Sequence, residues 1–559
     1  MTFLLQIQQG FEAQREELRR PVTLLESPGL QVLDLRFFHI SSEKGDTMKY
    51  TRVVRGKYYD SVTLMLAAKE LQNIDEVNDA SLSMATDANL RILEAADYEI
   101  SAINSNPSDL VIAIDYSGID PEEAFERAIE ILERPRAHSA DEETDYTPRS
   151  LEGALSVFPD ANLALISVAG QYAGDVTKDC LDRGLNVMLY SDNVPLETEI
   201  ELKQMASEKN LIVMGPDCGT AIIKGIGIGF ANAFPAGPVG IVAAAGTGLQ
   251  EVHVQLAKRE IGVLHGLGTG GRDVRESVGG ISFLLAMEAL IDDEGIECLI
   301  LVGKPPAKDV LETIITNATV CSKPVVVAFL GAAVGEDDEM NKVYFAGTLE
   351  EAAAIAAAVL KNEDVAAARK SLREVNPDLK RSCEAKTNRT GFLRGLYSGG
   401  TLAYEAQQIL SKKLGAIYSN TPLDSRYKLR DSLRPEGNCI IDYGEDEFTQ
   451  GRLHPMMDLA FRCERLVEQL EDKDVGVVLI DLVLGYGSHP DPAAEVTDAV
   501  AKARAEELPL MIAYVCGTDQ DPQKAQEQTR ILEQSGFVVC PSNAQAALLA
   551  GEFASRSDR

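Results

Sequence analysis

The chain has 559 residues, and at roughly 150 residues per domain this length predicts about three or four domains. Hydrophobic residues make up 45% and charged residues 25%, which is typical of a packed globular protein and excludes disordered, collagenous and coiled-coil chains. The net charge of −34 would repel nucleic-acid backbones and anionic membranes, so neither is an expected partner. No apolar run approaches the roughly 20 residues of a membrane-spanning helix.

The nine cysteines are scattered along the chain, and no Cys-x-x-Cys pair occurs. This pattern indicates mostly buried thiols in a reducing compartment, so the expected location is the cytoplasm. The six histidines are also dispersed, and no zinc-ligand spacing is present. We therefore expect no metal site.

Residues 1–47 differ from the rest of the chain and lack the apolar core of a signal peptide. Met48 opens a strand-like run followed by an apolar-periodic helix. We therefore expect Met48 to be the functional start and residues 1–47 to be either a dispensable extension or the product of a miscalled start. Residues 48–135 form a small α/β unit, with a strand at 108–117 and an acidic helix at 121–132, and residues 136–160 form a polar linker.

From residue 161 onward, short apolar strands alternate with helix-length segments, which is typical of parallel sheets in α/β domains. The strands at 161–168, 186–192 and 211–217 predict one domain over residues 161–236. A break near Pro235 separates it from a second domain over residues 237–360. The charged segment 361–389 is predicted to be a second linker or a solvated helix, and a third α/β domain covers residues 390–556.

Ligands in open α/β sheets bind at the carboxyl ends of strands, beside helix N-termini. Glycine-rich strand ends are the places to inspect, and they occur at 169–170, 215–220, 244–251, 268–273 and 485–488. In 244–251, Gly246 and Gly248 would let backbone N–H groups approach an anion, and Thr247 could cap the helix. The segment is neither a Walker loop nor a dinucleotide turn, and a tight turn feeding a packed helix is the alternative.

The segments 246–251 and 399–405 look alike, which indicates two strand-to-helix turns built in the same way. Among single residues, Lys304 follows a buried strand and so stands where ligands bind in such sheets. The alternative is that it is an exposed loop lysine without a role in binding. Arg272 could bind a carboxylate or phosphate, or could pair with Asp273 at the surface. His489 could act as a base or be a loop residue.

Cys218 has neither a base nor a cation near it in the sequence, so it is expected to be a small buried residue and not a nucleophile.

Several of these segments, taken in order, resemble succinyl-CoA synthetase. Residues 191–220, 237–251, 268–273 and 323–331 resemble its α-subunit from the second domain onward. Residues 441–458, 479–488 and 515–522 resemble the carboxy-terminal domain of its β-subunit. With the amino-terminal unit around 55–65, this fusion is typical of the FdrA family of acyl-CoA-synthetase-like proteins.

The resemblance covers nearly the whole chain from Met48 and implies several Rossmann-like and flavodoxin-like parallel-sheet domains. A CoA-binding-like Rossmann domain would cover 161–236, a succinyl-CoA synthetase-like flavodoxin domain 237–360, and a ligase-CoA-like domain 390–556.

The chain departs from the synthetase pattern at the residues that carry phosphate. The synthetase histidine that becomes phosphorylated corresponds to Phe345, and the glutamate that orients it corresponds to Lys304. A phenyl ring cannot accept phosphate, whereas a lysine would help to bind free phosphate. The resemblance places the two phosphate-binding helix N-termini at Gly246–Gly248 and at Gly485–Gly487.

The resemblance also places a substrate pocket near the strand ends of these domains. Its expected residues are Asn193, Asp217, Cys218, Gln250 and Asp273. Gln250 stands where the synthetase has a substrate-side tyrosine. The glycine motif that binds CoA in the synthetase is not recognisable, and no ATP-grasp segment is found in this sequence. CoA binding is therefore possible but doubtful, and no cofactor is required.

The FdrA family is associated with allantoin catabolism, as a component of oxamate carbamoyltransferase. The resemblance implies conversion of oxalurate and phosphate into oxamate and carbamoyl phosphate, in an oligomer with two partner subunits. Lys304, Arg272 and His489 would then be the catalytic residues, with Lys304 or Arg272 neutralising phosphate and His489 protonating the leaving group. The alternatives are an acyl-CoA ligase subunit that works with a separate ATP-grasp chain, and a non-catalytic scaffold or regulator.

Overall fold

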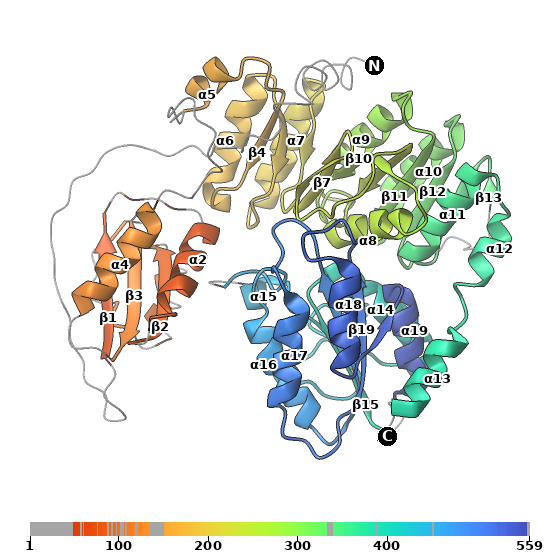
Figure 1. Cartoon of the computed structure of the whole chain (residues 1–559). Coiled ribbons are helices and arrows are strands. Elements are labelled where there is room, and N and C mark those ends of the chain that lie inside the picture. The colour runs from red at the N-terminus through yellow and green to blue at the C-terminus, as the bar shows by residue number, and fades with distance from the viewer. Residues whose placement is uncertain are drawn as a thin grey trace.

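A computed structural model describes residues 48–555, with gaps at single residues and short runs between 56 and 120 and at 135–149, 333–338, 387–388 and 450–451. The extension expected at 1–47 and most of the linker expected at 136–160 lie outside the described residues. Figure 1 shows the chain as separate α/β units, as the alternation of strands and helices predicts.

The first unit is a three-stranded antiparallel sheet in the order β1-β3-β2, built from β1 (Met48–Val54), β2 (Val77–Met84) and β3 (Leu110–Tyr116). Helices α2 (Ser61–Leu71) and α4 (Pro121–Glu133) pack on it. The central strand β3 is apolar from Leu110 to Ile114 because alternate residues enter two separate cores. The strand and the acidic helix predicted for this unit are confirmed.

The second unit is a small parallel sheet of β4 (Leu163–Ile166), β5 (Asn186–Leu189) and β6 (Val213–Met214). Its helices are α5 (Leu151–Val157), α6 (Gly170–Asp182) and α7 (Leu196–Glu208). The boundary predicted at residue 236 is wrong, because β7 (Thr220–Ile223) and β8 (Ile226–Gly229) form a hairpin that joins the next sheet. Lys224 and Gly225 both have positive φ, as a tight two-residue hairpin requires.

The third unit contains an eight-stranded sheet in the order β13-β14-β12-β11-β9-β10-β7-β8. Its other strands are β9 (Val239–Ala243), β10 (Val263–Gly268), β11 (Cys298–Gly303), β12 (Val325–Phe329), β13 (Glu339–Met340) and β14 (Val343–Phe345). Its helices are α8 (Gly246–Ala257), α9 (Ile281–Asp292), α10 (Lys308–Val320) and α11 (Leu349–Lys361). Strands β9 and β11 are buried along their whole length, which explains their continuous apolar sequences.

The linker predicted at 361–389 is instead a packed helical connection. It contains α12 (Val365–Lys370) and α13 (Pro377–Lys386). Asp364 caps the start of α12 with its side chain, and Cys383 on α13 is fully buried in the core that joins the third unit to the last. Cys383, together with the partly buried Leu379, thus anchors a charged helix that resembles a solvated one in the sequence.

The fourth unit is a six-stranded parallel sheet in the order β16-β17-β15-β18-β19-β20. The strands are β15 (Phe392–Tyr397), β16 (Tyr418–Ser419), β17 (Cys439–Asp442), β18 (Val475–Val483), β19 (Leu510–Cys516) and β20 (Val538–Cys540). The helices are α14 (Gly400–Leu414), α15 (Asp446–Thr449), α16 (Ala460–Glu471), α17 (Pro492–Lys502), α18 (Ala525–Gln534) and α19 (Asn543–Phe553).

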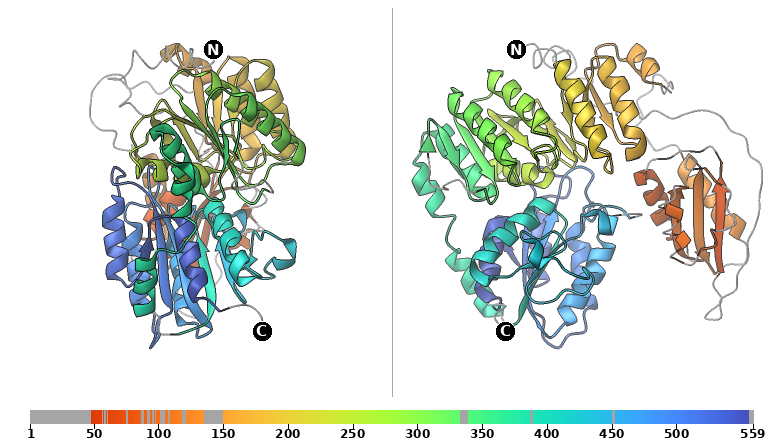
Figure 2. Two further views of the ribbon diagram at one scale, coloured as in Figure 1. Left: turned by 90° about the vertical axis from the view of Figure 1, so that its right-hand side faces the viewer. Right: turned by 180° about the vertical axis from the view of Figure 1, so that it is seen from behind.

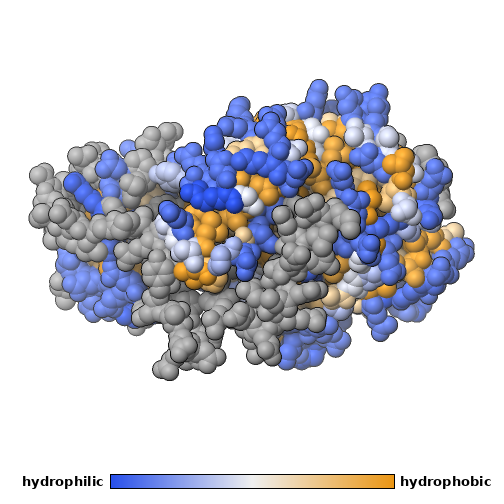
Figure 3. Space-filling view, turned by 90° about the horizontal axis from the view of Figure 1, so that it is seen from above, coloured by the Kyte–Doolittle hydropathy of each residue, from blue (hydrophilic) through white to orange (hydrophobic). Residues whose placement is uncertain are grey.

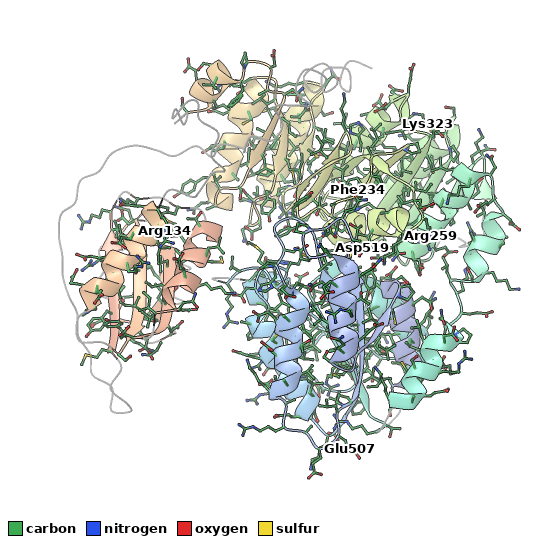
Figure 4. All side chains as sticks on the ribbon, in the orientation of Figure 1. Arg134, Phe234, Arg259, Lys323, Glu507 and Asp519 are labelled. Carbon is green, nitrogen blue, oxygen red and sulfur yellow. The ribbon has the colours of Figure 1, made fainter. Side chains whose placement is uncertain are left out.

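One continuous hydrophobic core joins the third and fourth units, which lie against each other in both views of Figure 2. Asn232 reaches across the junction and donates hydrogen bonds to the carbonyl oxygen of Leu484 at 2.9 Å and to Asp521 at 2.8 Å. Phe234, labelled in Figure 4, packs with its ring centroid 4.7 Å from that of His253 on α8. These contacts fix α8 relative to the fourth sheet.

Hydrophilic side chains surround separate hydrophobic patches on the face shown in Figure 3. Among the described residues, no helix combines the length and the apolar character that crossing a membrane would require.

Candidate active site

Two helices meet end to end where the third and fourth units join. Helix α8 begins at Gly246 and helix α14 begins at Gly400, and neither N-terminus is capped by a side chain. The backbone N–H of Thr401 donates a hydrogen bond to Oγ1 of Thr247 at 3.1 Å. Two positive helix ends thus converge, with one α14 amide taken up by Thr247, and this arrangement favours an anion such as phosphate.

The helix end that faces α8 is therefore α14, not the turn at Gly485–Gly487. In that turn Gly485 donates its N–H to Gln523 at 3.2 Å, and Tyr486 donates its N–H to the carbonyl oxygen of Ala231 at 2.9 Å. The next helix, α17, begins only at Pro492. This is a structural turn, because Gln523 takes up the Gly485 amide and the loop between β8 and β9 takes up the Tyr486 amide.

Thr247 also differs from its expected capping role. The residue before α8 is Ala245, and Oγ1 of Thr247 accepts a hydrogen bond from the other helix instead. A methyl group added at Gly248 would lie 3.0 Å from the side chains of Thr401 and Val302, so glycine allows the two helices to approach.

Lys304 lies beside the same junction, in the loop between β11 and α10. A Cβ on the preceding residue, Gly303, would lie 3.5 Å from the side chain of Ala244, in the turn before α8. The exposed Lys304 ammonium lies 5.3 Å from the centre of the Tyr404 ring, in the first turns of α14. An exposed cation therefore stands next to two positive helix ends, which together could bind an anion.

Asp442, which no sequence motif singles out, is the last residue of β17. Its side chain lies beside the first residue of α14. Its Oδ2 lies 2.6 Å from the position that a Cβ on Gly400 would occupy, so only glycine fits at residue 400. Burial and the charge of Glu445 raise the pKa of Asp442 to about 7, against the charge of Lys304. A carboxyl group that gains and loses its proton near neutral pH thus lies at the junction.

The turn that precedes α14 is held by a buried ion pair. The Asp481 carboxylate accepts hydrogen bonds from the N–H groups of Ser398 and Gly399, each at 2.8 Å. Arg462 binds the same carboxylate at 2.6 Å. Because these two amides are occupied, the amides that follow in α14 are the ones turned toward Thr247.

Arg272 and Asp273 connect the second unit to the third instead of lining the junction. Nε of Arg272 lies 2.8 Å from the Glu199 carboxylate, and its Nη2 donates to the carbonyl oxygen of Val194 at 2.8 Å. Asp273 is fully buried and accepts a hydrogen bond from Lys203 at 2.8 Å. The prediction that Asp273 lines a substrate pocket is therefore wrong, and the Arg272 guanidinium is already engaged by protein groups.

Carboxylates gather at the strand ends of the second and fourth units. The pKa of Asp217 is raised to about 7 because the surrounding protein disfavours the charged form and because Asp192, Asp446 and Glu445 repel further negative charge. The charge of Arg272 opposes this rise.

Asn193, predicted for the substrate pocket, is exposed beside Asp192. The structure thus places the predicted residues Asn193 and Asp217 near a group of acidic side chains.

The other predicted pocket residues are committed to the fold. Cys218 is 2% exposed, and burial raises the pKa of its thiol to about 12, so it remains protonated. Gln250 is buried on α8 and donates a hydrogen bond to the carbonyl oxygen of Phe230. Neither side chain is free to contact a substrate.

The structure also places His489, the predicted base, and Phe345, which stands where the synthetase has its phosphorylated histidine. The His489 ring lies 3.7 Å from Glu495 on α17, and its Nδ1 accepts the N–H of Asp491. Phe345 ends β14 inside the apolar core of the third unit and is 4% exposed.

A second histidine, His454, lies close to Asp442, because both side chains approach Gly444. Its Nε2 is 2.8 Å from the position that a Cβ on Gly444 would occupy, and burial lowers its pKa to about 4, so its ring is neutral. No motif singles out Asp442 or His454, although both lie in the segment 441–458 that resembles the synthetase β-subunit.

Comparisons with known proteins agree with the scaffold that this geometry suggests. Residues 396–553 match the family described as CoA-ligase. The chain is 29% identical over 183 residues to subunit alpha 2 of the ADP-forming succinate–CoA ligase of Archaeoglobus fulgidus, a match that covers 32% of this chain and 62% of that subunit. The protein thus has a succinyl-CoA synthetase-like scaffold with a CoA-ligase domain.

The chain is also 38% identical over 506 residues to the uncharacterized protein YahF of Escherichia coli, and the match covers 89% of this chain and 96% of YahF. The chain belongs to the same family as YahF. Among solved structures, ATP citrate lyase from Methanothrix soehngenii matches with a TM-score of 0.30 and 19% identity, covering 36% of this chain and 35% of that chain.

Residues 48–148 match a family described as AllF, heavy metal-associated domain. This segment of the chain contains no cysteine and a single histidine, His138. Within the described residues, no group of three or more histidine, cysteine, aspartate or glutamate side chains is placed to hold a metal ion. The residues present therefore do not fit a heavy metal ion.

Proposed function

We propose that this chain is the FdrA-type subunit of an oxamate carbamoyltransferase. The reaction converts oxalurate and phosphate into oxamate and carbamoyl phosphate, and the chain works in an oligomer with two partner subunits. The observation that carries the proposal is the convergence of the α8 and α14 N-termini beside Lys304, which forms a site suited to free phosphate.

The site supports direct attack by phosphate. Phosphate bound between the two helix ends would be neutralised by Lys304, and one of its oxygens would attack the ureido carbonyl carbon of oxalurate. The first-turn N–H groups of α8 and α14 that Thr247 does not take up would stabilise the negative charge that develops during the reaction. Such preorganised donors contribute about 3 kcal/mol each when they are well placed.

The residue at the end of β14 also supports a reaction without a phosphorylated intermediate. Phe345 is buried and has no atom that could accept phosphate. A reaction that makes an acyl phosphate from free phosphate needs neither a covalent phosphate carrier nor a nucleotide.

An acyl-CoA ligase subunit is the second candidate, favoured by the 29% identity to a succinate–CoA ligase subunit. The acidic strand ends of the second unit argue against it. Nucleotide-like ligands bind at the carboxyl ends of such strands, and Asp192 and Asp217 would there repel the phosphates of CoA.

Binding measurements separate the two candidates. We expect phosphate to raise the melting temperature of the chain and CoA to leave it unchanged, because a ligand stabilises only the state that binds it. Chloride at equal ionic strength is the control, since a chain with a net charge of −34 responds to salt alone. Stabilisation by CoA without stabilisation by phosphate would favour the ligase.

A further inference from the structure

The two oxygens of the Asp442 carboxyl group have different surroundings, and one of them faces the first turn of α14. Its Oδ1 accepts the N–H of Gly444 at 2.9 Å, whereas Oδ2 points toward Gly400. Among the described residues, no donor reaches Oδ2. The side chain is 2% exposed, so this carboxyl group is largely shielded from bulk water at the start of α14.

The main chain of Asp442 is fixed on both sides by one residue. Asn420 accepts the N–H of Asp442 at 2.9 Å and donates its amide to the carbonyl oxygen of Asp442 at 2.8 Å. Such a double contact, together with the Gly444 hydrogen bond, leaves the carboxyl group little freedom to turn. The position of Oδ2 at the helix end is therefore built into the fourth sheet.

Three charged groups from three elements act on this carboxyl group. Glu445, in the same loop, and Asp481, on β18, oppose its ionisation, while Lys304, from the third unit, favours it. Arg462 binds Asp481 and so reduces the effect of that carboxylate. Phosphate bound at the junction would add negative charge and would further favour the protonated carboxyl group.

We propose that Asp442 is the catalytic acid that delivers the proton this phosphorolysis must move. The proposal rests on the proposed function. An oxygen of hydrogen phosphate bonds to the ureido carbon of oxalurate, and the bond from that carbon to the oxamyl nitrogen breaks. Oδ2 of Asp442 gives its proton to the departing nitrogen, which leaves as the amide of oxamate.

The proton is then replaced from the other reactant. Hydrogen phosphate loses its proton when its oxygen becomes the bridging oxygen of carbamoyl phosphate, and the Asp442 carboxylate accepts that proton. One proton therefore passes from phosphate to oxamate through Asp442, and the site returns to its starting state. This assignment replaces His489, whose ring lies beside Glu495.

The variant Asp442→Asn tests the proposal because asparagine keeps the size of the side chain and cannot transfer a proton. We expect carbamoyl phosphate formation by the chain with its partners to fall at least about 100-fold. Phosphate affinity should stay the same or increase, since a negative charge is removed. The control is Asp498→Asn, an exposed position on α17, which should change the rate less than about twofold.

The pH profile distinguishes proton transfer from a structural role. The wild-type rate should fall as the pH rises through about 7, where Asp442 loses its proton. The residual rate of Asp442→Asn should lack this component of the profile. An Asp442→Asn rate within about twofold of the wild type, or an unchanged profile, would overturn the assignment.

Sulfate binding tests the same carboxyl group without the reaction. The charge of sulfate stays constant near neutral pH, so wild-type affinity for sulfate should fall above pH 7 as Asp442 ionises, and Asp442→Asn affinity should not. A wild type that binds sulfate in this way but makes no carbamoyl phosphate would refute the proposed function. Wild-type sulfate affinity independent of pH would refute the inference about Asp442.

Discussion

Lys304→Ala is expected to lower kcat/KM for phosphate about 100-fold, in assays of carbamoyl phosphate formation with the partner subunits. The substitution removes the cation that stands beside the two helix ends and Tyr404. Because Lys304 is exposed, the melting temperature should not change. The loss would therefore reflect phosphate binding and turnover, and not folding.

A neighbouring lysine provides the matched control. Lys308 begins α10, its side chain is 85% exposed, and its nearest carboxylate is Glu312 at 3.9 Å. Lys308→Ala should leave kcat/KM within about twofold of the wild type, since such surface pairs contribute little. Equal losses in the two variants, or no loss in Lys304→Ala, would contradict the role given to Lys304.

Lys203→Met is expected to lower the free energy of unfolding by about 3–5 kcal/mol. The Lys203 side chain is fully buried between Glu199 at 2.9 Å and Asp273 at 2.8 Å. Methionine fills a similar volume but leaves both buried carboxylates without this cation, and Arg272 reaches only Glu199. The urea midpoint for unfolding of the second and third units measures the effect.

Lys209, the next lysine along the chain, serves as the comparison. It pairs with Asp182 at 2.9 Å, but both side chains are exposed. Lys209→Met should change the free energy of unfolding by no more than about 0.5 kcal/mol. If the two variants unfold at the same urea concentration, the buried ion pairs do not stabilise the contact between these units.

Much of the fold could be predicted because parallel strands buried on both faces are continuous apolar runs. The strands at Val239–Ala243 and Cys298–Gly303 follow this rule. The first fixes where α8 begins, and the second fixes the position of Lys304. The likeness of segments 246–251 and 399–405 also indicated two turns of one kind. It did not show that these turns face each other, because that contact depends on how two sheets pack.

Other features depend on contacts between residues far apart in the chain. Lys203 lies in a helix rich in charged residues and looks solvent-exposed in the sequence, yet it is buried against the loop that contains Asp273. Gly485 lies in a glycine-rich strand end, but Gln523 takes up its amide. Asp442 ends a short strand, and its importance comes from its distance to Gly400. Local patterns carry none of this information.

The most direct test of the account is whether the chain with its two partner subunits makes carbamoyl phosphate from oxalurate and phosphate, in the absence of nucleotide and CoA. The account predicts equal amounts of carbamoyl phosphate and oxamate, at a rate that depends on phosphate concentration. Formation of neither product under these conditions, with product appearing only when ATP and CoA are added, would contradict it.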